Sequence, residues 1–255
     1  MQRVAVVTGA SSGIGAELSR LLATRGWHCV LLARREDRLR ALAAEIGGEY
    51  EVCDVADRAA VERTASHVLE RHSQIKLLVS NAGIPARAGF LDASPDTIES
   101  VMRTNYLGAV WCLRAFLPGL EAASPSDVVN VVSVAGAVAF PPSGPYSASK
   151  HAQLAFSRAT AAQLESRGIR VHTVKPGFVE TEGFPQGKLP PALRRLVVGP
   201  ETIAEHIADS VERGRRETSV PRYYGLAGLL QAVAPNVLRR VLARPRGRST
   251  IGPDG

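Results

Sequence analysis

The sequence predicts an α/β protein: a doubly wound parallel sheet with helices on both faces, in three α/β/α layers. Short runs rich in valine and leucine alternate with segments of helical apolar spacing through most of the chain. A glycine-rich turn follows the first apolar run and leads straight into the first helical segment. The 255 residues suffice for a sizeable core, and no internal boundary divides them, so we expect one domain over residues 1–255.

The predicted strands and helices follow one another in regular order. Apolar runs predict strands at residues 3–7, 28–33, 50–53, 76–79, 128–132 and 170–174. Apolar residues spaced by three or four positions predict helices at residues 13–24, 36–46, 58–71, 104–121 and 147–167. A helix between successive strands is the connection that parallel pairing requires.

The last part of the chain breaks this rhythm. Residues 182–198 contain three prolines, which predicts a mobile insertion on the substrate side. Residues 223–244 have helical apolar spacing, interrupted at Pro235, and predict a C-terminal extension of two short helices before a flexible tail at 245–255. The arginines of this segment also fit a basic amphipathic helix on an anionic membrane, but packing on the core or on another subunit is the preferred interpretation.

The net charge of +7 is confined to the C-terminal part of the chain. Residues 213–255 hold nine Arg against Glu217 and Asp254, whereas residues 1–212 hold 22 basic and 22 acidic side chains. A balanced main body argues against a nucleic-acid-binding groove. We therefore expect no nucleic-acid partner.

The start of the chain and its cysteines bear on location. An apolar run begins at Val4 and leaves no room for a signal peptide, so we expect a cytoplasmic protein. Cys29, Cys53 and Cys112 are widely spaced and form no paired-cysteine motif. Neither disulfides nor a metal site are expected.

The glycine-rich turn predicts a phosphate-binding loop. Residues 8–15 read Thr-Gly-Ala-Ser-Ser-Gly-Ile-Gly between the first strand and the first helix. Glycines there permit a tight turn and close approach of the backbone to a pyrophosphate, and the helix amino end attracts the anion. The residues expected at the cofactor phosphates are Gly9, Ser11, Ser12, Gly13, Ile14 and Gly15.

The end of the second predicted strand bears on the choice of cofactor. An acidic residue roughly 20 positions after the loop usually binds the free ribose 2′-hydroxyl of NAD(H). This sequence has Arg34 and Arg35 there, and guanidinium groups bind a 2′-phosphate well. We therefore expect NADP(H), although Glu36 and Asp37 also allow a simple solvated helix start.

Four polar residues predict a catalytic group. Tyr146 and Lys150 are four apart on a predicted helix and share one face. A nearby ammonium favours phenolate, so Lys150 is expected to lower the tyrosine pKa from its usual value of about 10. Ser133 follows the valine-rich strand 128–132, at an end where parallel sheets bind ligands. Asn105 adds a polar group in a predicted apolar helix, where a local cap is the structural alternative.

Together these motifs resemble those of the short-chain dehydrogenase/reductase family, of the shorter, single-domain type with a Rossmann fold. The resemblance covers residues 3 to 181 and includes Asp54-Val55, Asn81-Ala82-Gly83 and Pro176-Gly177-Phe178-Val179-Glu180-Thr181. It implies that Asp54 and Val55 contact the adenine and that Asn81, with Ala82 and Gly83, lines the adenosine ribose. It also implies that Pro176, Gly177, Val179 and Thr181 hold the carboxamide end. Ser80 and Ser12 depart from residues common in the family at these positions.

The resemblance also implies a mechanism. Hydride passes between nicotinamide and a carbonyl carbon while Tyr146 gives or takes the proton at oxygen. Ser133 binds the same oxygen, Lys150 also holds the nicotinamide ribose, and Asn105 holds a water that links Lys150 to solvent.

The substrate is less constrained than the reaction. Predicted pocket walls are largely apolar, and comprise Val134, Ala135, Phe140, Phe178, Phe184 and residues 189–198. The leading expectation is an NADP(H)-dependent oxidoreductase acting on a small hydrophobic ketone or alcohol. The alternatives are reduction of 3-oxoacyl thioesters of acyl carrier protein or coenzyme A, and a non-catalytic nucleotide-sensing protein. A homodimer or homotetramer is the habit of the family.

Overall fold

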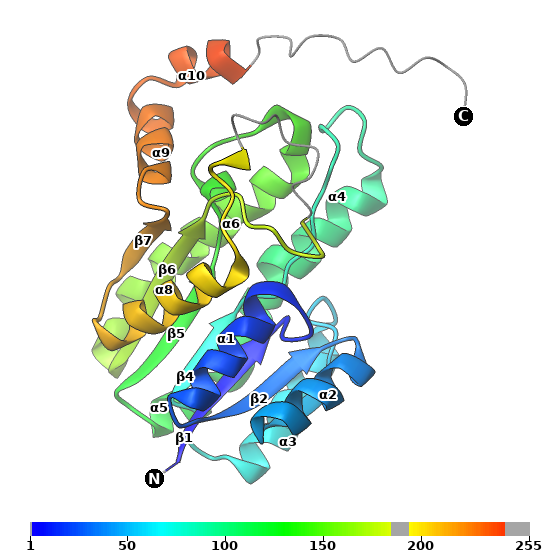
Figure 1. Ribbon diagram of the computed structural model, residues 1–255, viewed down its shortest axis with the longest axis vertical. Coiled ribbons are helices and arrows are strands. Elements are labelled where there is room, and N and C mark those ends of the chain that lie inside the picture. The colour runs from blue at the N-terminus through cyan, green and yellow to red at the C-terminus, as the bar shows by residue number, and fades with distance from the viewer. Residues whose placement is uncertain (1, 185–193, 243–255) are drawn as a thin grey trace.

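The computed structural model describes residues 2–184 and 194–242, which contain a seven-stranded sheet with every pair of neighbouring strands parallel (Figure 1). The strands are β1 (Arg3–Thr8), β2 (Trp27–Ala33), β3 (Glu49–Val52), β4 (Leu77–Ser80), β5 (Ser126–Val131), β6 (Ile169–Pro176) and β7 (Glu217–Val220). They lie in the order β3-β2-β1-β4-β5-β6-β7. The order reverses between β1 and β4, and open parallel sheets bind ligands beside such a reversal, at the carboxyl ends of the strands.

Helices cover both faces of the sheet, and two further helices follow the last strand in the described part of the chain (Figure 1). They are α1 (Gly13–Thr24), α2 (Glu36–Ile46), α3 (Arg58–Arg71), α4 (Pro95–Met102), α5 (Gly108–Ala122), α6 (Gly144–Leu164), α8 (Pro200–Glu212), α9 (Tyr224–Val233) and α10 (Pro235–Leu242). Apolar residues of α1, α2 and α8 form one buried cluster with the sheet, and those of α3, α5 and α6 form another. The expected three-layer α/β/α arrangement is confirmed.

Local sequence signals set several helix ends. The Asp57 carboxylate accepts hydrogen bonds from the backbone N–H groups of Ala59 and Ala60 at the start of α3, and the Ser94 hydroxyl accepts one from Thr97 at the start of α4. Gly47 ends α2 in the left-handed region at φ 65°, where a residue with a side chain is strained. These signals are local, and each follows from residue type.

The six predicted strands are present, but three elements were not predicted. The helix expected at 104–121 begins at Pro95 as α4 and continues through a π-helical turn (Arg103–Leu107) into α5. Helix α8 carries Ile203 and Ile207 on its buried side. Their four-residue spacing is typical of a helix, but no helix was predicted there. Strand β7 lies at the edge of the sheet and ends in its one apolar residue, Val220, so it produces no apolar run.

The C-terminal part matches the expectation in its elements. Two short helices, α9 and α10, flank Pro235. Within the predicted insertion at 182–198, residues 185–193 lie outside the described part of the chain, as do residues 243–255. Outside these gaps, no helix is both long and apolar enough to cross a bilayer.

Candidate active site

The glycine-rich loop runs from the end of β1 to the start of α1. Gly9 and Gly13 have φ angles of 67° and 56°, and a Cβ on Gly15 would lie 2.5 Å from the Gly9 carbonyl oxygen. Side chains at these positions are therefore excluded by backbone conformation or by space. No side chain caps the amino end of α1, so its first N–H groups can meet an anion. The loop fits the pyrophosphate of a dinucleotide.

Thr8 and Asn81 brace this loop across the strand reversal. The Thr8 hydroxyl donates to Val79 and accepts from the backbone N–H groups of Asn81 and Ala82 at 3.0 and 3.1 Å. The Asn81 amide donates to the carbonyl oxygens of Thr8 and Gly9. Asn81 thus holds the loop in place, a role that the sequence did not predict.

The predicted adenosine end gathers charged side chains. Arg35 donates to the hydroxyls of Ser11 and Ser12 at 3.0 and 2.6 Å, and its guanidinium lies 3.2 Å from Glu182. Arg34 lies 3.8 Å from Asp54. A hydrogen bond from Arg38, with the charges of Arg38 and Arg35, lowers the pKa of the Glu182 carboxyl. The site therefore holds cations suited to a 2′-phosphate, with Glu182 as a competing anion.

Arg38 was missed by the sequence reasoning. It lies one turn after Arg35 on α2 and hydrogen-bonds Glu182. Its three-residue spacing from Arg35 was a readable signal.

Ser133 and Tyr146 meet beyond the carboxyl end of β5. The Ser133 hydroxyl accepts a hydrogen bond from the N–H of Ala135 at 3.1 Å, at the start of a 3₁₀ turn (Val134–Gly136). Tyr146 lies in the first turn of α6, with its hydroxyl beside that of Ser133, whose hydrogen bonding acts to lower the tyrosine pKa. The Phe184 ring packs on that of Tyr146 with 5.5 Å between ring centres. Two hydroxyl groups thus lie close together at the carboxyl end of the sheet, where ligands bind.

Lys150 lies beneath Tyr146 and is almost fully buried. Its ammonium nitrogen is 5.9 Å from the centre of the Tyr146 ring, and it donates to the Val131 carbonyl at 3.0 Å and to Gln153 Oε1 at 2.7 Å. Gln153 was not predicted to take part. Its Oε1 and the Val131 carbonyl are the acceptors that make a buried amine tolerable.

The expected effect of Lys150 on Tyr146 is not observed in the protein alone. Burial raises the pKa of Tyr146 to about 12, although its hydrogen bond with Ser133 acts in the opposite direction. Burial also lowers the pKa of Lys150 to about 7. Loss of water around both groups outweighs their mutual influence, so the expected downward shift of the tyrosine pKa was wrong for this state.

Asn105 lies in the π-helical turn and is fully buried. Its Oδ1 accepts from the Ile84 N–H at 2.8 Å, and its Nδ2 donates to the Ile84 carbonyl and to Ser149 Oγ, each at 3.0 Å. Asn105 therefore links the segment after β4 to α6, which is more than the local cap considered above. Gly83 lies beside it, and a Cβ there would be 3.3 Å from Asn105 Oδ1 and 3.7 Å from Lys150 Nζ.

The segment that follows β6 returns to the glycine loop. A Cβ on Gly13 would lie 3.1 Å from the Thr181 methyl, and Gly177 donates its N–H to Val220 at 2.8 Å. Val179 is buried and pairs with Val198 in a β-bridge. Val55 is also buried, against Gly108, and can offer a ligand little beyond its backbone. Most predicted cofactor residues thus lie at the carboxyl ends of the strands.

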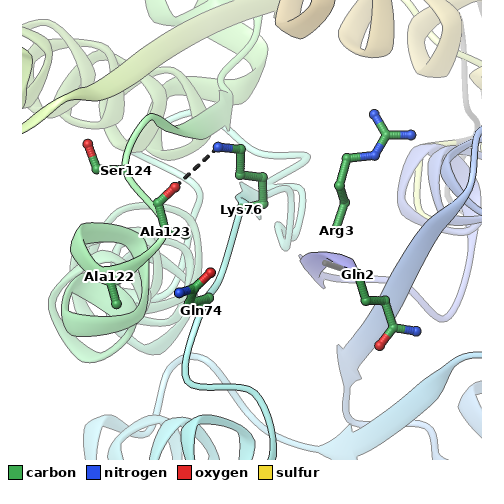
Figure 2. Close-up of a pocket in the computed structure, with 7 residues that line it drawn as sticks. All are labelled: Gln2, Arg3, Gln74, Lys76, Ala122, Ala123 and Ser124. Atoms are coloured by element: carbon green, nitrogen blue, oxygen red, sulfur yellow. Dashed lines mark hydrogen bonds between the residues drawn. The ribbon is translucent and has the colours of Figure 1, made fainter.

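Two apolar or hollowed regions lie near the ends of the sheet. Predicted wall residues Val134, Phe140 and Phe178 pack together with Tyr224 of α9 beside Ser133. A separate pocket of about 330 Å³ is lined by Arg3, Lys76 and residues 122–124. Figure 2 shows these residues and the hydrogen bond that Lys76 donates to the Ala123 carbonyl. Arg3 begins β1, so this pocket lies at the amino ends of the strands, away from Ser133 and Tyr146.

Comparison with known proteins identifies the family. Residues 3–187 match the family model described as short chain dehydrogenase. The chain belongs to the short-chain dehydrogenase family. It is 34% identical over 189 residues to dehydrogenase/reductase SDR family member 7B of Bos taurus, an alignment covering 70% of this chain and 58% of that protein. It is 34% identical over 184 residues to the 3-oxoacyl-[acyl-carrier-protein] reductase of Bos taurus, covering 71% and 78%.

Solved structures of short-chain dehydrogenases share the fold. An alcohol dehydrogenase from the archaeon Thermococcus sibiricus, complexed with 5-hydroxy-NADP, has a TM-score of 0.77 and 31% identity, covering 86% of this chain and 96% of that one. An actinorhodin polyketide ketoreductase variant with NADPH has a TM-score of 0.78 and 29% identity, covering 86% and 95%. A Burkholderia phymatum family member in complex with NAD has a TM-score of 0.82 and 25% identity, covering 93% and 95%. Cofactors of both kinds therefore occur on this fold.

Proposed function

We propose that this short-chain dehydrogenase is an NADP(H)-dependent oxidoreductase that interconverts a carbonyl group and a secondary alcohol. The observation that carries the proposal is the pairing of the Ser133 and Tyr146 hydroxyls at the carboxyl end of β5, with the buried amine of Lys150 behind them. A binding module has no chemical need for such a group. The arrangement matches what proton transfer to a carbonyl oxygen requires.

A nicotinamide cofactor would supply or accept the hydride when bound, and the chain's own residues would position the reactants and move the proton. Tyr146 donates its proton to the carbonyl oxygen during reduction, while Ser133 hydrogen-bonds the same oxygen and stabilises the charge that develops there. Lys150 would hold the nicotinamide ribose and, when protonated, would favour the tyrosinate left behind. Asn105 and Gln153 fix the segments around Lys150 through hydrogen bonds.

The preference for NADP(H) rests on Arg34, Arg35 and Arg38. These guanidinium groups lie around the end of β2, where the adenosine 2′-position is expected. Bidentate contacts from arginine suit a phosphate, and Glu182 is free to exchange its arginine contacts for solvent when the phosphate enters. NAD(H) lacks the charge that would compensate for breaking these ion pairs.

Reduction of a 3-oxoacyl thioester is the second candidate. It is favoured by the similarity to the bovine 3-oxoacyl-[acyl-carrier-protein] reductase and to the polyketide ketoreductase. Its chemistry at the carbonyl is the same, and Arg194 and Arg195 are exposed near the predicted pocket walls, where a carrier phosphate would meet them. The substrate panel below separates the two candidates.

The first experiment measures absorbance of the reduced nicotinamide during incubation with aryl ketones, lipophilic carbonyls, sugars and 3-oxoacyl thioesters, with NADPH and NADH in parallel. We expect NADPH to be consumed with a hydrophobic ketone. Tyr146→Phe should lower turnover by at least about 100-fold, because a proton-transfer group contributes that much. Its affinity for NADPH, measured by fluorescence titration, should stay within a few-fold of wild type.

Each result has a distinct meaning. Equal or better turnover with NADH contradicts the cofactor assignment, and activity retained by Tyr146→Phe contradicts the proton-donor assignment. Consumption with thioesters alone selects the second candidate. Tight NADPH binding with no turnover of any carbonyl, and none of alcohols with NADP⁺, favours a nucleotide-sensing protein.

A further inference from the structure

Exposed apolar side chains concentrate on the last two described helices. The exposed fractions of Leu226, Leu229 and Val233 on α9 are 69%, 59% and 71%, and those of Val237 and Val241 on α10 are 51% and 56%. We name the surface formed by these side chains the α9–α10 apolar face: Leu226, Leu229, Leu230, Val233, Val237 and Val241. An apolar surface of this kind on a globular protein marks a site of interaction.

Helix α9 presents its large apolar residues to solvent, whereas an ordinary surface helix presents them to the core. Leu226, Leu229 and Val233 lie three, four or seven positions apart and share the solvent-facing side. The inward side has small residues: Ala227 packs on the cluster beside Ser133, and a Cβ on Gly228 would lie 3.0 Å from that of Ala137. Figure 1 shows α9 and α10, in orange to red, beyond the end of β7. Of the two preferred interpretations from sequence, packing on the core is therefore wrong for these leucines and valines, and packing on another subunit stays a prediction.

The chain segment that carries this face has charges of one sign. Residues 218–253 contain no Asp or Glu, whereas Arg222, Arg239 and Arg240 are exposed and three further arginines follow at positions 244, 246 and 248 of the sequence. At about 100° a residue, Arg240 lies about 60° from Val237 around α10. A second copy placed on this face would bring arginines against arginines without a compensating acid. An anionic surface is the complementary partner.

We propose that the α9–α10 apolar face docks on an anionic lipid bilayer, with the leucines and valines in the interface and the flanking arginines on the headgroups. Basic residues beside an exposed apolar helix face are the combination that produces peripheral membrane binding. Each arginine near an anionic surface adds attraction that salt weakens. The proposal does not depend on the catalytic assignment.

The position of the face has a consequence for substrate class, and this part rests on the proposed function. Tyr224 and Leu238, which anchor α9 and α10, belong to the same buried cluster as Val134, Phe140 and Phe178 beside Ser133. A bilayer on the α9–α10 apolar face therefore lies next to side chains that are predicted to line the substrate site. Ketones dissolved in the membrane become the favoured substrates.

The test is co-sedimentation of the full chain with vesicles of phosphatidylglycerol mixed with phosphatidylcholine, and with phosphatidylcholine alone. The wild type should bind the anionic vesicles, and added salt should weaken binding. Leu226→Gln combined with Leu229→Gln should lower the partition coefficient by more than about tenfold, because burial of each leucine in the bilayer interface adds to the free energy of vesicle binding. Arg240→Gln should weaken the preference for anionic lipid, whereas Arg239→Gln, on the side of α10 opposite Val237 and Val241, should change it less. Leu91→Gln, at a fully exposed leucine before α4, is the matched control and should bind like wild type.

Oligomeric state and turnover distinguish the other outcomes. Failure of the wild type to sediment with anionic vesicles overturns the proposal. If the leucine variant instead dissociates an oligomer in analytical ultracentrifugation and vesicle binding is absent, the face binds a second copy. Where the wild type binds vesicles, the leucine variant, which no longer binds them, should lose turnover of a membrane-dissolved ketone while keeping that of a small water-soluble one. Equal turnover of both overturns the substrate inference alone, whereas no turnover by any form contradicts the proposed function and leaves docking tested by sedimentation.

Discussion

At the residue scale, Lys150 places a buried ionisable amine in the candidate site, and this lowers the free energy of unfolding. Its side chain is 3% exposed, and burial lowers its pKa to about 7. Between about pH 7 and the usual lysine pKa of about 10.4, the unfolded chain holds a proton that the folded chain has lost. Stability from this group therefore rises with pH across that window and is constant below it. Under the proposed function, catalysis rather than folding accounts for an amine in this position.

Lys150→Met removes this dependence. We expect the free energy of unfolding of wild type, relative to the variant, to rise by about 2 kcal/mol from about pH 7 to pH 9, since each unit adds up to about 1.4 kcal/mol. Urea unfolding followed by circular dichroism at several pH values measures the difference. Lys76→Met, at the amino end of β4, is the baseline for loss of a lysine elsewhere. If the difference in free energy of unfolding between wild type and Lys150→Met is the same at every pH in the window, the lowered pKa of Lys150 is contradicted.

The residue scale also shows what a sequence can and cannot reveal about a site. The four-residue spacing of Tyr146 and Lys150 was enough to place them on one helix face. The position of Ser133 directly after the valine-rich strand was enough to place it at the ligand-binding end of the sheet. The direction of the tyrosine pKa was predicted wrongly because desolvation depends on tertiary packing. Gln153 was missed for the same reason: its contact with Lys150 matters only because both are buried.

At the scale of elements, α5 shows a helix fixed by its neighbours. A Cβ on Gly119 would lie 2.5 Å from Leu69 Cδ2 and 2.8 Å from Ile75 Cγ1, so glycine permits the close approach of α5 to α3 and the segment before β4. We expect Gly119→Ala to lower the free energy of unfolding by about 1–3 kcal/mol through overpacking, despite the better helix propensity of alanine.

Gly225 on α9 is the matched position. Its nearest neighbour to a new Cβ would be Ser219 Oγ at 3.5 Å, an ordinary contact. Gly225→Ala should therefore leave the protein unchanged or stabilise it by about 0.5 kcal/mol. Chemical unfolding of both variants checks the pair, and equal effects contradict the packing argument.

Element boundaries were predictable where signals were local and failed where they were not. The glycine loop and the strand starts follow from residue type and spacing. The continuous path from α4 through the π-helical turn into α5 does not, because Asn105 at its centre is held by Ile84 and Ser149 from other segments. The edge strand β7 was missed because its pairing with β6 supplies stability that its own sequence does not show.

At the scale of the whole molecule, both outer strands of the sheet begin with an anchored glutamate. Burial opposes ionisation of Glu49 on β3, but hydrogen bonds from His28, His72 and Arg71 outweigh it and lower the pKa to about 2. A hydrogen bond from Arg158 on α6, supported by Lys175, likewise lowers the pKa of Glu217 on β7 to about 2. Each carboxylate joins an edge strand to its neighbours. The two edges of the sheet are thus held by the same chemistry.

Acid should loosen both edges of the sheet together. Because the folded pKa of each glutamate is below the unfolded value, the stabilisation is complete above about pH 4.5 and is lost as the pH falls towards about 2. Allowing for solvent screening at side chains about a third exposed, each contributes on the order of 1 kcal/mol.

Glu49→Gln and Glu217→Gln should each flatten the acid side of the stability profile, measured by urea unfolding from neutral pH downwards. Glu99→Gln, at an exposed position on α4, should leave it unchanged. Since the two sites lie at opposite edges, the double variant should show the sum of the single effects. A double variant no flatter than either single one would mean that acid unfolding begins elsewhere in the molecule.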